Sequence, residues 1–284
     1  MTRRATLWMI AVVTLCALAG VWRWRTLPVT KVGGVLIAGG DGGGLPRTAP
    51  ELEGFEAAAL ATAAANAFKQ GASALLIMRH GHLVYEKYER GSDAVTPVEG
   101  GELARSLLIV AAGIAVAQHG MIMPAPPIDS ERLAAAIAAA SGRNYPSFLS
   151  RHVWQPLHAA PAYWTASGVS ARGVDWLRVG DLLLHDGRFE GTQVVQPGWV
   201  ARHSSQLFGP GIESPAATGL LTLHGPGSMR LWLAPRLDVV ILRVAGAPPL
   251  GAAIDETLAR TIINTLRDRP ATDGGRLNDL VPGH

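Results

Sequence analysis

Glu102, Arg105 and Ser106 stand at the beginning of an apolar segment that runs to Ile122, and their residue types are the first in the chain that bear on catalysis. A hydroxyl at the start of a helix can attack a carbonyl once a nearby base has taken its proton, and a buried lysine can be that base. Arginine cannot, because its guanidinium stays protonated. A glutamate in the first turn of a helix is favoured by the helix dipole alone. We therefore interpret Glu102 as a residue that starts the helix rather than as a nucleophile.

The lysines of the chain allow a direct test for the pair that such chemistry needs. There are only three, Lys31, Lys69 and Lys87, and none has a serine three residues before it. A Ser-x-x-Lys pair, with its two side chains one helical turn apart, is therefore absent from the sequence. Ser106 lies one residue beyond Arg105 and points about 100° further round a helix. We interpret Ser106 as a small polar residue on the helix.

Two other groups of residues have spacings that invite comparison with metal sites. His80 and His82 would share one face of a strand, but no third ligand is evident, and we interpret them as turn and edge residues. Asp175, Asp181 and Asp186 have irregular spacing, which favours helix caps and solvated positions. The sequence therefore predicts no metal site and no cofactor.

The periodicity of the apolar residues predicts the elements that would position these side chains. Residues 52–70 are rich in alanine, place apolar residues at helical spacing and end at Gly71, which predicts a helix. Two apolar runs joined across His80-Gly81 predict a hairpin with strands at 74–79 and 82–88. The remaining predicted elements are a helix over 102–122, an amphipathic helix over 176–185, a strand pair within 221–245 and a helix over 251–267.

Several of these segments resemble the serine β-lactamase and penicillin-binding-protein family, in particular its class C-like members. Residues 107–122 resemble the helix that carries the family's nucleophile, and ALLIMRHGHLVYEKYERG, residues 74–91, resembles the family's first strands. Residues 142–200, which contain GRNYPSFLSRHVWQPL and GTQVVQPGWV, resemble sequence motifs of the family in their order and spacing. The resemblance implies a divergent, shortened member with a mixed α/β (α+β) fold of the β-lactamase/transpeptidase type. We expect an antiparallel sheet flanked by helices, with a reduced helical lobe.

The resemblance also says where the family's first two catalytic elements would lie. Glu102 and Arg105 occupy the positions of the family's serine nucleophile and its lysine. The family's Tyr-x-Asn motif has no counterpart, because residues 125–127, Ala-Pro-Pro, fill its place. Both elements are therefore expected to be missing.

The third catalytic element of the family survives in part. A Lys-Thr-Gly or His-x-Gly element normally begins the strand that lines the active site and supplies part of the oxyanion hole. It corresponds here to His224-Gly225-Pro226-Gly227, although Pro226 removes one N–H donor. His224, Gly225 and Gly227 are the candidate substrate-binding residues, and His224 is equally compatible with a structural role.

Three hypotheses for the function follow from these observations. The favoured one is a catalytically degraded family member that binds a peptide, a cell-wall fragment or an ester, or acts as a scaffold, in the cell envelope. The alternative is an active amide or ester hydrolase that uses Ser106 or Ser228 with His224. The third is an envelope scaffold whose domain only positions an anchor.

Composition bounds these hypotheses. The chain has 284 residues, of which 48% are hydrophobic, and its net charge is only +3. A chain of this size and composition can bury one substantial core. The basic residues are scattered rather than clustered, which argues against nucleic acid as a partner. Trp154, Trp176 and Trp199 are predicted to fill the core.

The N-terminal residues favour export. Two arginines precede an uncharged apolar run over residues 7–22, which predicts a signal peptide or membrane anchor over residues 1–25. Trp22 and Trp24, each followed by arginine, favour retention in the membrane. We expect a protein that is anchored in the inner membrane and faces the periplasm, or is secreted to the periplasm. A Gly/Pro-rich linker is predicted over 26–50, a β-lactamase/transpeptidase-like domain over 51–268 and a tail over 269–284.

Overall fold

The computed structural model describes residues 33–124, 129–209, 219–227, 229–246 and 252–267. The chain divides into two units, Met1–Gly34 and Val35–His284, and the elements below belong to the second. The predicted leader, residues 1–25, and the predicted tail, residues 269–284, lie outside the described residues. No helix in the described ranges combines the length and the apolar character that crossing a membrane requires.

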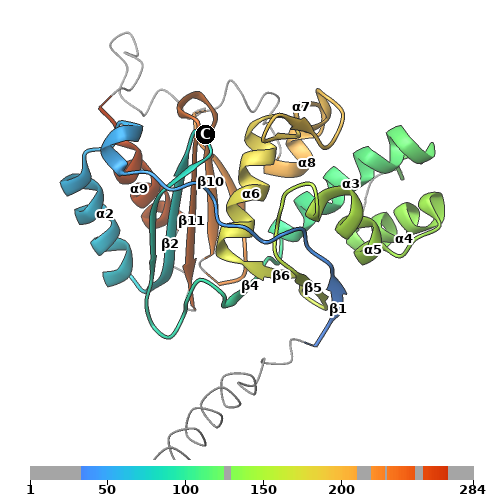
Figure 1. The fold of residues 1–284 in the computed structure, drawn as a ribbon, viewed down its shortest axis with the longest axis horizontal. Coiled ribbons are helices and arrows are strands. Elements are labelled where there is room, and N and C mark those ends of the chain that lie inside the picture. The colour runs from blue at the N-terminus through green and yellow to red at the C-terminus, as the bar shows by residue number, and fades with distance from the viewer. Residues whose placement is uncertain (1–32, 125–128, 210–218, 228, 247–251, 268–284) are drawn as a thin grey trace, which may run out of the picture. The chain divides into compact units, whose positions relative to one another are not determined.

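A five-stranded antiparallel sheet forms the centre of this unit, with the strand order β3-β2-β11-β10-β9 (Figure 1). Strand β2 pairs with β3 through the turn at His80 and with the central strand β11, which lies much later in the sequence. These strands are β2 (Ala72–Arg79), β3 (His82–Tyr88), β9 (Leu221–His224), β10 (Arg230–Ala234) and β11 (Val239–Ala245). The predicted hairpin and the predicted late strand pair are both confirmed.

Both faces of this sheet are buried, because alternate side chains of a strand point to opposite faces. Leu75 and Ile77 of β2 belong to one apolar cluster, whereas Leu76 and Met78 belong to the other. Residues of β11 divide between the two clusters in the same way. The near-continuous apolar sequence of β2 follows from this double burial.

Helices cover each face of the sheet (Figure 1). On one face lie α2 (Ala57–Lys69) and α9 (Ala252–Ile263), and on the other lies α6 (Gly173–Leu184). The helix predicted over 52–70 begins later than expected, because η1 (Pro50–Glu53) ends at Gly54 with φ +77°. Helix α6 approaches the sheet closely at Gly180, where a Cβ atom would lie 2.6 Å from Val240.

A second lobe holds a four-stranded antiparallel sheet and several helices next to α6 (Figure 1). The sheet has the order β1-β5-β6-β4, and the helix predicted over 102–122 ends at His119 because Gly120 adopts φ +62°. The elements of this lobe are β1 (Val35–Ile37), β4 (Pro97–Glu99), α3 (Leu103–His119), α4 (Ser130–Ser141), α5 (Tyr145–Leu149), the π-helical η2 (Ser150–Trp154), β5 (Ala162–Thr165) and β6 (Gly168–Arg172). The described elements that remain are β7 (Arg188–Phe189), β8 (Thr192–Gln193), α7 (Trp199–Arg202), α8 (Ser204–Phe208) and η4 (Pro235–Leu237).

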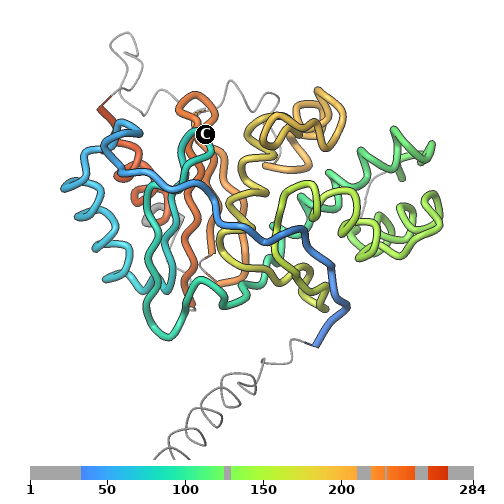
Figure 2. The backbone as a smooth tube through the Cα atoms, viewed as in Figure 1, coloured from blue at the N-terminus to red at the C-terminus, as the bar shows by residue number. Residues whose placement is uncertain are grey.

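The predicted linker over 26–50 is wrong for residues 35–50. Residues Val35–Ile37 form β1, which pairs with β5, and the segment after it runs across both lobes before α2 begins (Figure 2). Its backbone is bonded along the way, for example from Gly40 N to Ala159 O at 2.8 Å and from Thr48 N to Leu83 O at 3.3 Å. This segment is therefore part of the folded unit, whose first strand begins at Val35 rather than at residue 51.

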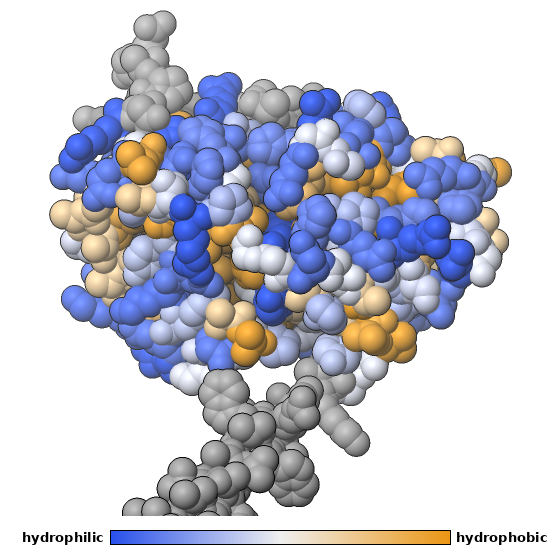
Figure 3. Space-filling model, in the orientation of Figure 1, coloured by the Kyte–Doolittle hydropathy of each residue, from blue (hydrophilic) through white to orange (hydrophobic). Residues whose placement is uncertain are grey.

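The surface is largely hydrophilic on the face shown in Figure 3, with apolar side chains in separate patches. The predicted core tryptophans are confirmed, since Trp154, Trp176 and Trp199 are at most 5% exposed. Trp199 also donates its indole N–H to Ile109 O at 2.9 Å, which ties α7 to α3. The large apolar side chains that remain exposed among the described residues are Val35, Leu36, Leu52, Val95 and Ile122.

Candidate functional site

Two glycines bring the start of α3 close to the loop that follows β9. Gly101 has φ +52°, and a Cβ atom there would lie within 2.8 Å of the Pro226 ring. Its neighbour Gly100 donates its N–H to Val169 O at 2.7 Å, which fixes the chain against β6. The helix start and the His224-to-Gly227 loop therefore meet, as the resemblance predicts.

A pocket of about 380 Å³ opens at this junction. It is bounded by the first turn of α3, by α8 and by the end of β9. The structure thus brings Glu102, Arg105 and His224 together, although long stretches of sequence separate the last from the other two. The lining residues are Glu102, Arg105, Ser106, Gln206, Leu207, Phe208, Gly209, Thr222, Leu223 and His224.

Gly225 and Gly227 do not line this pocket, contrary to their expected role beside His224. Gly225 donates its N–H to Met229 O at 3.0 Å, and a Cβ atom at Gly225 would overlap the Met229 side chain. Gly227 adopts φ +62° in the turn between β9 and β10. These glycines shape the turn, and their backbone serves the strand pair rather than a ligand.

Glu102 and Arg105 are both exposed in the pocket. Glu102 is the N-cap residue of α3, but its side chain makes no capping hydrogen bond. Among the residues that the structure describes, neither side chain forms an ion pair. The two residues that the resemblance aligns with the family's nucleophile and lysine therefore present a free carboxylate and a free guanidinium to the pocket.

Ser106 borders the same pocket but is only 2% exposed. Its hydroxyl donates to Leu103 O at 2.6 Å, within the same helix. A hydroxyl engaged in this way has its proton committed to the helix backbone. Ser228, the other serine of the hydrolase hypothesis, lies outside the described residues, as do residues 125–127.

His224 stands at the mouth of the pocket in an environment that favours its neutral form. Partial burial and the Arg230 guanidinium lower the pKa of His224 below its ordinary range, and Glu102 and Asp255 only partly oppose this. A neutral imidazole offers one donor and one acceptor. At neutral pH His224 can therefore hydrogen-bond a polar ligand without repelling a cationic one.

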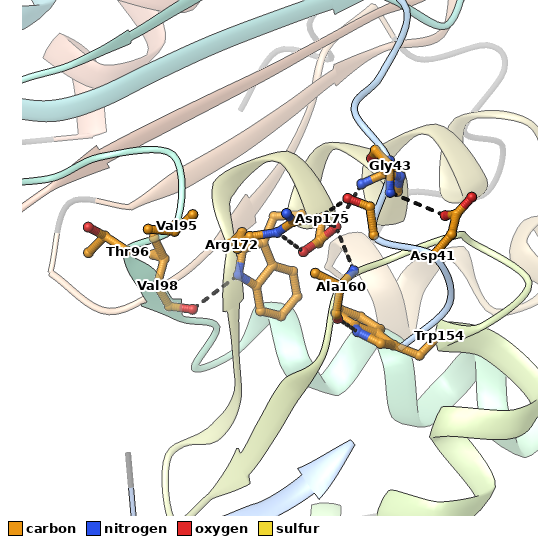
Figure 4. Close-up of polar contacts among 12 residues, drawn as sticks. Asp41, Gly43, Val95, Thr96, Val98, Trp154, Ala160, Arg172 and Asp175 are labelled. Carbon is orange, nitrogen blue, oxygen red and sulfur yellow. Dashed lines mark hydrogen bonds and ion pairs between the residues drawn. The ribbon is translucent and has the colours of Figure 1, made fainter. Parts of the chain in front are cut away.

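Asp175 is not a solvated residue, and this correction has a clear physical reason. Its side chain is completely buried and accepts hydrogen bonds from Arg178 at 2.7 Å, from Arg172 at 2.9 Å and from the Ala160 N–H at 3.3 Å. Figure 4 shows Arg172 and Ala160 converging on this carboxylate, with Gly43 close by. Arg178 also donates to the Gly43 carbonyl. The carboxylate therefore holds the arginine through which α6 binds the segment after β1.

The other two aspartates differ from each other. Asp186 accepts hydrogen bonds from the N–H groups of Gly198 and Ala201 at the start of α7, whose N-cap residue is Gly198. Asp181 is buried, contrary to the expected solvated position, and lies near His185. Asp181 and His185 are at positions i and i+4 of the helix, a spacing that is visible in the sequence. The sequence-based interpretation of the three aspartates overlooked this pair.

His80 and His82 take the predicted positions in the β2–β3 turn and at its edge. Both contact one carboxylate, with 2.7 Å between His80 Nδ1 and Glu53 Oε2, and 2.8 Å between His82 Nδ1 and Glu53 Oε1. His80 adopts φ +48°, which the turn requires.

The described residues that could together hold a metal ion are Asp181, His185 and Asp238.

The fold described above is also found in solved structures. No family model and no curated protein matches the sequence. A protein from Bacillus anthracis assigned as a 6-aminohexanoate-dimer hydrolase is similar with a TM-score of 0.63 and 15% identity, over 86% of this chain and 93% of the other.

Two β-lactamase structures are also similar. One, assigned as a β-lactamase from Bacteroides dorei, has a TM-score of 0.56 and 11% identity, over 74% of this chain and 99% of its own. The other, from Mycobacterium bovis, has a TM-score of 0.52 and 15% identity, over 71% of this chain and 97% of its own. These similarities confirm the predicted β-lactamase/transpeptidase-like fold. At such identities they describe the fold, and the chemistry has to be argued from the residues.

Proposed function

We propose that this chain is a catalytically degraded member of the serine β-lactamase and penicillin-binding-protein family that binds a ligand in the pocket at the start of α3. The observation that carries the proposal is the exposure of Glu102 and Arg105 in that pocket, while Ser106 is buried and bonded to Leu103 O. An arginine cannot take the proton from a nucleophile. A pocket in which arginine replaces the lysine base can still bind a ligand.

The charges of the pocket indicate the class of ligand. The Arg105 guanidinium can hold a carboxylate through two parallel hydrogen bonds. Glu102 can accept from an amine or an amide N–H, and His224 adds a neutral donor and acceptor. A short peptide or cell-wall fragment with a free carboxylate fits this arrangement best, and an ester with a carboxylate is the next candidate.

The cellular setting belongs to the same proposal. The charged and apolar residues at the N-terminus support export, with the protein anchored in the inner membrane or secreted to the periplasm. Cell-wall fragments are available in that compartment, in agreement with the ligand class. A scaffold that only positions an anchor is the competing explanation, and it requires no ligand in the pocket.

Covalent labelling tests the absence of catalysis. We expect neither a fluorophosphonate nor a fluorescent penicillin to form a covalent adduct with the purified chain, as measured by intact-mass spectrometry. An adduct that disappears in Ser106→Ala would instead establish the active hydrolase that uses Ser106 with His224. An adduct on any other serine would equally contradict the proposal.

Ligand binding is tested through Arg105. With short peptides that end in a free carboxylate, we expect saturable binding by calorimetry, and Arg105→Gln should weaken it at least tenfold, because a charged hydrogen-bonded pair contributes about 1.5–3 kcal/mol. Amidated versions of the same peptides should bind as weakly to the parent chain. Arg151→Gln, an exposed arginine outside the pocket, serves as the control and should leave binding unchanged. If no peptide binds, or if Arg105→Gln and Arg151→Gln bind the peptides equally well, ligand binding at this pocket is contradicted and the scaffold explanation is favoured.

A further inference from the structure

A second pocket, of about 430 Å³, lies at the end of α6 and shares no lining residue with the pocket at the start of α3. Asp181 and His185, from the last turn of α6, and Asp238, from the turn between η4 and β11, meet at its wall. One ligand atom from each of these residues lies within 4.8 Å of the other two. His80 and His82 line the same pocket.

The hydrogen bonding of His185 leaves one ring nitrogen available. Nδ1 lies 3.0 Å from the backbone oxygen of Asp181, four residues earlier in the chain. An imidazole that donates from Nδ1 to a backbone carbonyl keeps a lone pair on Nε2, and this arrangement is common among histidines that bind metal ions. Nε2 is the atom that faces Asp238, with 3.3 Å to Oδ1.

The two carboxylates supply an independent observation. The Asp181 side chain is only 9% exposed, and its Oδ1 atom is buried without a hydrogen bond, as is Oδ1 of Asp238. Asp181 Oδ1 lies 3.2 Å from His185 Nδ1, but that nitrogen is aligned with the backbone oxygen instead. Buried carboxylate oxygens without hydrogen bonds are costly unless a cation compensates them.

The spacing of one pair of these atoms, His185 Nε2 and Asp238 Oδ1, fits a bound ion. Nitrogen and oxygen ligands lie about 2.0–2.2 Å from Zn²⁺ in a tetrahedral site, which places two ligand atoms about 3.3–3.6 Å apart. The distance of 3.3 Å between His185 Nε2 and Asp238 Oδ1 falls in this range, whereas two atoms joined by a directed hydrogen bond are usually closer.

We infer that Asp181, His185 and Asp238 form a binding site for a divalent transition-metal ion of the zinc class. One imidazole with two carboxylates suits Zn²⁺ or Co²⁺ better than Mg²⁺ or Ca²⁺, which prefer oxygen ligands alone. His80 and His82 line the same pocket. The competing arrangement is a protonated His185 held between the two carboxylates, which raise the pKa of His185 to about 10 in the absence of an ion.

The experiment uses the full chain without an affinity tag, treated with a chelator and then titrated with ZnCl₂ or CoCl₂. We expect one ion per chain by calorimetry and elemental analysis, together with the visible absorption of tetrahedral Co²⁺. Asp238→Asn and His185→Gln should each weaken binding at least tenfold. The asparagine variant suits the backbone, because Asp238 adopts φ +52° and asparagine tolerates that conformation.

Two control variants make the result decisive. Glu190→Gln changes an exposed carboxylate at the edge of the same pocket and should leave the affinity unchanged. Circular dichroism would verify that each variant is folded. The inference is overturned if the folded parent chain binds neither ion. It is equally overturned if an ion binds but is lost only in His82→Gln, which would place the ion at His80 and His82. Peptide binding at the α3 pocket is measured separately, so either result stands without the other.

Discussion

Asp175→Ala is expected to lower the free energy of unfolding by about 3–5 kcal/mol, because it leaves buried guanidinium groups without their counter-ion. Arg178 is 2% exposed and donates to Asp175 at 2.7 Å, and Arg172 donates to the same carboxylate at 2.9 Å. Burial lowers the pKa of Arg178, and the charge of Asp175 opposes that shift. Without the carboxylate, Arg178, which donates to the Gly43 carbonyl, also loses the partner that orients its guanidinium.

Denaturant unfolding followed by tryptophan fluorescence measures this effect. Asp41→Ala is the matched control, since Asp41 lies on the same segment with its side chain 70% exposed. Its removal should change the free energy of unfolding by no more than about 0.5 kcal/mol, as for most surface substitutions. Equal losses in the two variants would show that the buried ion pairs do not hold this segment.

Asp255→Ala is expected to have an effect of similar size on the opposite face of the sheet, again about 3–5 kcal/mol. The carboxylate of Asp255 is 3% exposed and lies 2.5 Å from Arg243 Nη1 and 3.1 Å from Arg230 Nη2. Arg243 is completely buried and also donates to Gln70 O at 3.2 Å. The carboxylate thus joins α9 to β10 and β11, and Arg243 links β11 to the end of α2.

Hydrogen exchange separates this effect from a general loss of stability. In Asp255→Ala, amides of α9 should exchange through local opening, earlier than the amides of β2 and β11. Glu256→Ala is the control, because Glu256 is the next residue and pairs with Arg260 at the surface. It should cost about 0.5 kcal/mol or less. Uniform exchange across the sheet and α9 in the aspartate variant would contradict the proposed role of Asp255.

The parts of the fold that the sequence predicted are those with a local cause. The apolar run of β2, the turn at His80-Gly81 and the helix of α6 depend on neighbours along the chain. The linker prediction failed because a glycine can indicate either a flexible backbone or a site of close packing. A Cβ atom at Gly39 would overlap the backbone of residues 159–161, so this glycine permits close packing rather than flexibility. That contact joins distant segments, and composition alone does not reveal it.

The candidate sites also combine residues that are close in the sequence with residues that only the fold brings together. The meeting of Glu102, Arg105 and His224 was predictable only through the resemblance, because the two segments are distant in sequence. The cluster of Asp181, His185 and Asp238 has a local half, the pair on α6, and a distant half in the turn before β11. No pattern in the sequence relates Asp238 to the helix. Three-dimensional structure was needed to complete the set.

The pairing of β2 with β11 determines when this protein can fold during synthesis. Residues 72–79 leave the ribosome well before their partners at 239–245. Until then β2 has only β3 beside it in the sheet, although α2 and α6, which pack against β2, have already been synthesised. Contacts between such distant segments close large loops and slow folding. A chain cut short before Val239 therefore lacks the centre of its sheet and leaves one edge of β2 unpaired.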